Sequence, residues 1–172
     1  MRTLKIGFSR PKTWKPFASL IMNAYRIPYD HVYIKIYAPN YDREIIYQAS
    51  KSMVNFMSPD VFKDENLVVR EFEMPINEDS YRILMQFAID NAGKHYGVKN
   101  ILGLTYVRIC YWLGKTVRNP FNDRGATYIC SELVAKILKD FEGLKLDKDL
   151  TDMTPLDVYN LLISLNSQVV PA

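Results

Sequence analysis

A cysteine, a histidine and a glutamine are the residues of this chain whose types could together perform nucleophilic chemistry. Cys130 lies in the stretch "YICSELVAKIL" (residues 128–138), whose apolar residues recur at helical spacing. A helix N-terminus carries partial positive charge and free N–H groups, which favour a thiolate and can also bind an oxyanion. His31 opens the stretch "HVYIKIY", and Gln48 lies in "EIIYQAS". Together they would make a Cys–His–Gln arrangement, with Cys130 as nucleophile, His31 as general base and Gln48 as the group that orients the imidazole.

Each of these residues also has an ordinary structural interpretation. Free cysteine is among the most buried residue types, so Cys130 could be a small core residue that shares a helix face with Val134 and Ile137. For Cys110, which lies deep in an apolar stretch, we expect only this structural role. His95, the other histidine, is expected to be a surface residue near a helix end.

The strands that must position these residues lie in the first half of the chain. Alternating β-branched and aromatic residues predict strands over 4–9, 31–37, 44–50 and 67–74. The turn "APNYDR" joins the second and third of them into an antiparallel hairpin, which can bring Gln48 beside His31. We expect a short helix over 14–25, and a loop over 51–66, which contains Pro59.

Helices dominate the second half. Asn77 is a candidate N-cap for the first, a very apolar helix covers about 98–114, and the cysteine helix runs from about 128 to 141. The last helix begins at "TPLD", with Thr154 and Asp157 spaced as in a capping box. Strands followed by helices predict an α+β fold, and the length fits one domain over residues 1–172.

Composition and charge exclude several classes of protein. The net charge of +3 comes without a run of basic residues, so nucleic-acid binding is not expected. The apolar stretch 101–114 is short and contains Arg108, which predicts a buried helix rather than a transmembrane segment. Two histidines and two cysteines, taken as reduced, lack the spacing of a metal site, so we expect no metal or cofactor.

The first residues, "MRTLKIGFSRPK", lack the apolar core of a signal peptide. This predicts a cytoplasmic protein, unless it is released by lysis or packaged in a particle.

Four blocks resemble the circularly permuted NlpC-type papain-like cysteine hydrolases, in their YiiX-like branch. "YDHVYIKI" followed by "IIYQAS" is similar to the histidine region of that family, and "AGKHYGVKNILG" to its tyrosine–glycine region. "TYICSELVAKIL" resembles its nucleophile helix, and "MTPLDVYN" a segment further downstream. The blocks span roughly residues 28–160, and "CSELV" is the most specific of them.

The resemblance implies a papain-like fold of permuted topology, in which a small antiparallel sheet packs against helices and the histidine precedes the cysteine. It implies Cys130 as nucleophile, His31 as base and Gln48 at the orienting position, which is often acidic in relatives. Tyr96 matches a tyrosine of the family and is expected to contact the oxyanion or the substrate. A core-packing role for Tyr96 stays open.

Three functions stay open from the sequence. The first is a cysteine peptidase or amidase acting on an amide bond, for example in peptidoglycan peptides of the cell wall. The second is a thioesterase or acyltransferase acting on a lipid or acyl substrate. The third is a non-catalytic structural or interaction module, for example a virion or envelope component that retains the fold. An acyl-group enzyme should have an apolar groove beside Cys130, and a muropeptide enzyme should have polar walls there.

Overall fold

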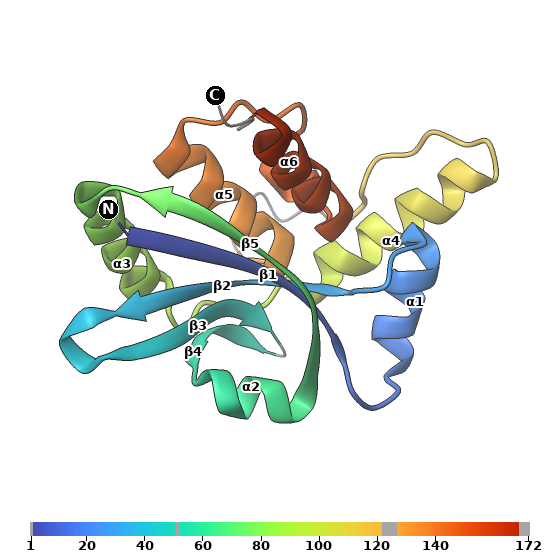
Figure 1. The fold of residues 1–172 in the computed structure, drawn as a ribbon. Helices are drawn as coiled ribbons and strands as arrows, with labels where there is room; N and C mark the ends of the chain where they lie inside the picture. The colour runs from blue at the N-terminus through green and yellow to red at the C-terminus, as the bar shows by residue number, and fades with distance from the viewer. Residues whose placement is uncertain (1, 51, 122–126, 169–172) are drawn as a thin grey trace.

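The fold is an antiparallel sheet with helices on both faces and at its ends, as seen in a computed structural model that describes residues 2–50, 52–121 and 127–168 (Figure 1). The five strands are β1 (Arg2–Pro11), β2 (His31–Ala38), β3 (Arg43–Ser50), β4 (Met53–Met57) and β5 (Asn66–Ile76). Their order across the sheet is β4-β3-β2-β1-β5, and all neighbours pair antiparallel. The α+β class predicted from the sequence is confirmed.

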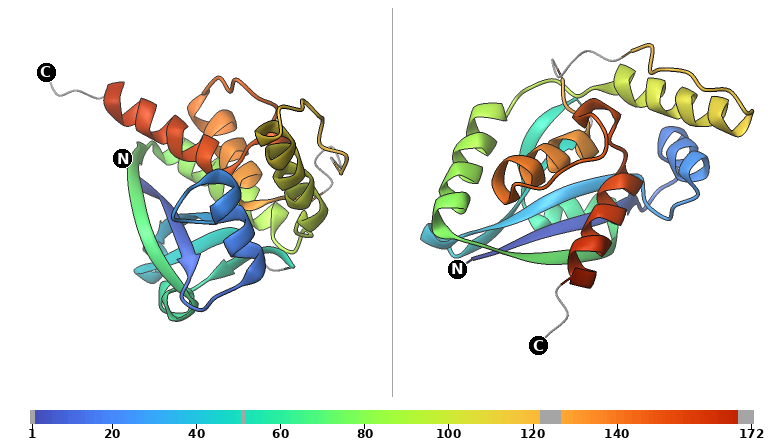
Figure 2. Two further views of the ribbon diagram at one scale, coloured as in Figure 1. Left: turned by 90° about the vertical axis from the view of Figure 1, so that its right-hand side faces the viewer. Right: turned by 90° about the horizontal axis from the view of Figure 1, so that it is seen from above.

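The helices lie between the strands and after them. They are α1 (Pro16–Tyr25), α2 (Pro59–Glu65), α3 (Glu78–Asn91), α4 (Val98–Trp112), α5 (Cys130–Glu142) and α6 (Pro155–Gln168), with short 3₁₀ turns η1 (Pro39–Tyr41) and η2 (Leu150–Asp152). α5 and α6 cover one face of the sheet, α2 lies on the other, and α1 and α4 lie together beyond one end (Figures 1 and 2).

The main core lies between the sheet and α5. Val32, Ile34 and Ile36 of β2 are fully or almost fully buried there against apolar residues of α5 such as Val134 and Ile137. Because successive side chains of a strand point to opposite faces, His31 and Tyr33 belong to the α2 face. Tyr33 packs there with Phe62 of α2, in a second, smaller cluster.

Several local predictions are confirmed. The Asn77 side chain caps α3 by accepting a hydrogen bond from the Ser80 N–H. At the start of α6 the Thr154 hydroxyl accepts from the Asp157 N–H at 3.2 Å, and the Asp157 carboxylate accepts from the Thr154 N–H at 3.0 Å. This is the capping box predicted at "TPLD". α5 ends at Gly143, which takes a positive φ of 63°.

Two predictions about the elements are wrong. The segment 51–66 is not a loop, because it contains β4 and α2, and the Ser58 hydroxyl caps α2 with Pro59 at the first helical position. α4 is not buried on all sides, because Leu102, Tyr106 and Trp112 are each more than 40% exposed. Among the described residues, no helix has the length and apolarity needed to cross a membrane. The stretch "RNPFNDRGA" (residues 118–126) is also predicted to be a loop, and residues 122–126 of it lie outside the described residues.

Candidate active site

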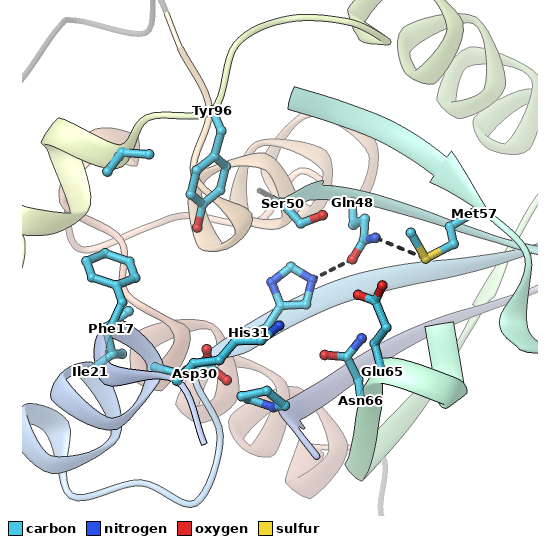
Figure 3. Close-up of a pocket in the computed structure, with 14 residues that line it drawn as sticks. Phe17, Ile21, Asp30, His31, Gln48, Ser50, Met57, Glu65, Asn66 and Tyr96 are labelled. Carbon is cyan, nitrogen blue, oxygen red and sulfur yellow. Dashed lines mark hydrogen bonds between the residues drawn. The ribbon is translucent and has the colours of Figure 1, made fainter. Parts of the chain in front are cut away.

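The hairpin of β2 and β3 brings His31 and Gln48 into contact. His31 Nε2 lies 2.7 Å from the Gln48 carbonyl oxygen, a hydrogen bond in which the imidazole N–H donates to the amide (Figure 3). Ile34 pairs with Tyr47 across the hairpin, so His31 and Gln48 are diagonal neighbours on the same face of the sheet. With Nε2 protonated, the neutral ring presents an unprotonated Nδ1, which is the form a general base requires.

Gln48 is itself held in place by β4. Its amide nitrogen donates to Asn55 Oδ1 at 3.4 Å and lies 3.8 Å from the Met57 sulfur. Asn55 pairs with Gln48 across β3 and β4, and its own amide donates to the Met53 carbonyl at 3.3 Å. These contacts direct the carbonyl end of the Gln48 amide toward His31. Asn55 is not predicted from the sequence, because its segment is expected to be a loop; the alternation in "MVNFM" is the signal for a strand there.

The surroundings of His31 favour its neutral form. The ring stacks near Tyr33, with centroids 6.5 Å apart, and lies 6.3 Å from the Phe62 ring. Burial against these groups lowers the pKa of His31 to about 4, and the hydrogen bond to Gln48 only partly opposes that effect. At neutral pH His31 is therefore an uncharged imidazole, and the same burial makes it a weaker base than an exposed histidine.

Cys130 is the first residue of α5 and lies against the start of β2. The backbone N–H groups of Val32 and Ser131 and the Tyr96 hydroxyl all interact with its thiol, and each of them lowers the thiol pKa. Val32 directly follows His31, so the cysteine helix meets β2 one residue beyond the histidine. These three groups are the donors that would stabilise negative charge on the sulfur.

Burial nevertheless outweighs these donors. Cys130 is 1% exposed, and desolvation raises the pKa of its thiol to about 11. The expectation that the helix N-terminus favours a thiolate is therefore wrong for this structure, in which the sulfur is a neutral thiol at neutral pH. Because the pKa of Cys130 is raised while that of His31 is lowered, the two groups are not a preformed thiolate–imidazolium pair.

Asp30 is a third ionisable group at this place, and no role for it is predicted from the sequence. Its Oδ1 is buried and accepts no hydrogen bond among the described residues, and burial raises the pKa of Asp30 to about 6. Its negative charge also raises the pKa of Cys130. The signal available in the sequence was its position directly before His31.

A cavity of about 250 Å³ opens beside these groups (Figure 3). His31, Gln48, Asp30 and Tyr96 line one part of it, and Phe17, Ala18 and Ile21 of α1 form an apolar wall. The described residues that line this cavity do not include Cys130. Because the Tyr96 hydroxyl interacts with the thiol while the Tyr96 ring lines the cavity, Tyr96 lies between the sulfur and the open space.

The remaining candidates lie elsewhere. Cys110 is buried in α4 and is a free thiol, as is Cys130, so the described structure contains no disulfide between them. His95 is exposed, as predicted. Within the described ranges, no three His, Cys, Asp or Glu side chains gather into a group that could hold a metal ion.

Comparison of the chain with known protein-family models and with curated proteins finds no match. The arrangement of the site therefore has to be interpreted from its own geometry.

Proposed function

We propose that the protein is a cysteine hydrolase, with Cys130 as nucleophile, His31 as general base and Gln48 as the residue that orients the base. The observation that carries the proposal is the 2.7 Å hydrogen bond from His31 Nε2 to Gln48. It fixes the tautomer whose free Nδ1 can take a proton, one residue before the Val32 N–H that contacts the thiol. A direct contact between the His31 ring and the thiol is what the proposal adds to these observations.

Because both groups are neutral in the resting site, the proposed mechanism is general-base activation rather than attack by a standing ion pair. Nδ1 of His31 takes the Cys130 proton as the sulfur attacks the acyl carbon, and a carbon–sulfur bond forms. The backbone N–H of Cys130 and the Tyr96 hydroxyl stabilise the oxyanion. The imidazolium then protonates the leaving amine as the carbon–nitrogen bond breaks, and water hydrolyses the thioester with His31 again accepting a proton.

An amide bond is the proposed target, and a specific observation favours an acyl substrate as the second candidate. The wall of Phe17, Ala18 and Ile21 is the apolar surface that an acyl chain would need, whereas Asp30 and Gln48 give the same cavity polar groups suited to a peptide. Burial of Cys130 favours the third candidate, a non-catalytic module that retains the fold.

Turnover separates the three candidates. The full chain with Cys110→Ser, which leaves Cys130 as its only thiol, is assayed on peptide p-nitroanilides and on acyl thioesters of increasing chain length. Release of amine that is abolished by Cys130→Ala and by His31→Ala supports the amidase. Release of thiol alone, faster for longer acyl chains, assigns the acyl function. No turnover of either substrate, and no acyl adduct on Cys130 by intact mass, contradicts the hydrolase proposal.

A further inference from the structure

Positive charge is concentrated in two segments that lie side by side. Residues 10–26 and 97–121 contain eight of the 22 lysines and arginines of the chain and none of its 19 acidic residues. These segments hold α1 and α4, which pack together through Ile21, Ile101 and Leu104 (Figure 2). The rest of the chain therefore carries net negative charge, so the modest overall charge conceals two basic segments. Asp149, Asp152 and Asp157 line a cavity on the side of α4 that includes Leu104 and Arg108.

The outward side of α4 is apolar. Five residues at helical spacing are each 39–70% exposed: Val98, Leu102, Tyr106, Ile109 and Leu113. We call these five residues the α4 stripe. The opposite side of the helix buries Ile101, Leu104 and Cys110, so it is the inward side that packs the helix onto the protein. A contiguous exposed apolar stripe of this length is unusual on a protein surface that binds no partner and no membrane.

Aromatic rings and arginines lie together next to the stripe. Trp112 and Tyr111 are 46% and 66% exposed, and the Arg26 guanidinium lies 5.3 Å from the Trp112 ring centroid. Arg108 lies 5.5 Å from Tyr111 and 6.0 Å from Trp112. Tryptophan and tyrosine rings beside arginines are typical of surfaces that lie at the level of lipid headgroups.

We propose that the α4 stripe docks on a lipid bilayer whose surface carries anionic headgroups. The apolar side chains would enter the boundary between headgroups and acyl chains, and the lysines and arginines would pair with lipid phosphates. A helix of 15 residues lying flat presents a contact about 22 Å long. A second copy of this chain is disfavoured as the occupant, because a symmetric contact would bring the lysines and arginines of two such α1 and α4 pairs together.

The proposal does not depend on the candidate active site, although the two adjoin. Val98, the first residue of the stripe, also lines the cavity that contains His31, together with residues of α1. A bilayer bound at α4 would therefore lie near the mouth of that cavity.

The first test measures binding of the full chain to vesicles. Vesicles of phosphatidylcholine with about one third phosphatidylglycerol should bind the protein, and vesicles of phosphatidylcholine alone should not. Binding should weaken as NaCl is raised to about 0.5 M, where charges are screened within a few ångströms. Absence of binding to the anionic vesicles, or equal binding to both, overturns the proposal.

Two double variants test whether vesicle binding depends on the α4 stripe or on exposed apolar side chains in general. Leu102→Ser with Ile109→Ser should reduce binding at least tenfold, because both side chains leave the bilayer contact. The matched control is Ile83→Ser with Ile89→Ser on α3, whose side chains are 54% and 62% exposed, and it should bind as the unmodified chain does. Equal loss in both pairs contradicts the assignment to α4.

A second pair tests the charges. Lys99→Gln with Lys115→Gln should weaken binding to anionic vesicles about 25-fold, since each basic residue near such a surface contributes roughly a factor of five. Lys63→Gln with Lys139→Gln, which removes two exposed charges from α2 and α5, is the control and should bind nearly unchanged.

Tryptophan fluorescence gives a readout beside the unmodified stripe. The chain has two tryptophans, so Trp14→Phe leaves Trp112 as the reporter. Its emission should be quenched by anionic vesicles that contain brominated acyl chains. Unquenched emission from bound protein shows that another surface docks and overturns the proposal. Self-association that Leu102→Ser with Ile109→Ser abolishes, without vesicle binding, assigns the stripe to a second copy instead.

Discussion

The thiol of Cys130 lies against the backbone N–H of Val32, where the first turn of α5 meets the start of β2. This contact links two segments almost a hundred residues apart and places the sulfur next to the residue that follows His31. It also explains why the thiol is neutral, because the packing that brings the helix to the strand removes the sulfur from water.

Removing the charge of Asp30 should make the thiol more acidic. In a Cys110→Ser background, Asp30→Asn removes a negative charge that raises the pKa of Cys130, so that pKa should fall by about one unit. Iodoacetamide should then modify Cys130 roughly tenfold faster at pH 8. The gain should shrink below about pH 6, where Asp30 itself takes up a proton. Asp64→Asn, on the exposed side of α2, is the control; an equal gain there would refute the effect.

Two substitutions of Tyr96 should act in opposite directions. Tyr96→Phe keeps the ring between cavity and sulfur but removes a hydroxyl that lowers the pKa of Cys130, so modification by iodoacetamide should slow. Tyr96→Ala opens the path from the cavity to the thiol, so modification should accelerate. The two rates, measured by intact mass over time, distinguish a hydrogen-bond donor from a steric barrier. If neither change alters the rate, Tyr96 has no role at the thiol.

Acid should destabilise the fold through His31. Its pKa is about 4 in the folded protein against 6.5 for an unperturbed histidine, so the unfolded chain takes up the proton first as pH falls. Protonation of His31 therefore costs no stability above about pH 6.5. As the pH falls from 6.5 to 4, the free energy of unfolding decreases by about 3 kcal/mol in total. Urea unfolding of the protein and of His31→Gln at pH 7.5 and pH 5 measures it. A loss of stability on acidification that is as large in His31→Gln would rule this out.

Asp30 contributes to the same pH range with the opposite sign. Its pKa rises from 3.8 to about 6 on folding, so the unfolded chain releases its proton first and stability falls as pH rises between those values. Because Asp30 is unchanged in His31→Gln, the difference between the two proteins isolates the histidine.

Gly7 should be intolerant of a side chain. The Tyr33 ring lies across Gly7 from the neighbouring strand, where a Cβ atom would overlap its outer carbons and oxygen. Tyr33 has little freedom to retreat, since its hydroxyl donates to Glu71 at 2.7 Å and its ring packs on Phe62. Gly7→Ala should lower the free energy of unfolding by about 1–3 kcal/mol. In a Tyr33→Ala background the same exchange should cost much less, and equal costs would disprove the clash.

The sequence predicts the elements around the site well where a periodic pattern and a boundary signal agree. The alternation in "HVYIKIY" and "EIIYQAS" and the short turn between them determine the hairpin, and the register follows from which face is apolar. That register places Gln48 beside His31, as expected. β4 and α2 were missed because Pro59 was interpreted as a loop residue, although Ser58 and Pro59 together form a helix start.

The electrostatic state of the site could not be predicted in the same way. A helix N-terminus is a local feature, and its effect on a thiol is visible in "YICSEL". Burial of Cys130 depends on α5 packing against β2 and on Tyr96 covering the sulfur, which involve residues distant in sequence. The exposure of the outward face of α4 could not be predicted either. Periodicity shows which residues share a face of a helix, but it does not show which face packs against the rest of the protein.

The most direct test of the central claim is the rate at which a small electrophile modifies Cys130, measured with and without the imidazole. In a Cys110→Ser background, His31→Ala should slow acylation of Cys130 by an activated ester about a hundredfold or more, because a general base contributes at least that much. His95→Ala, which removes the exposed histidine, should leave the rate unchanged. If His31→Ala and the unmodified site react at the same rate, His31 does not activate the thiol and Cys130 is a buried structural residue.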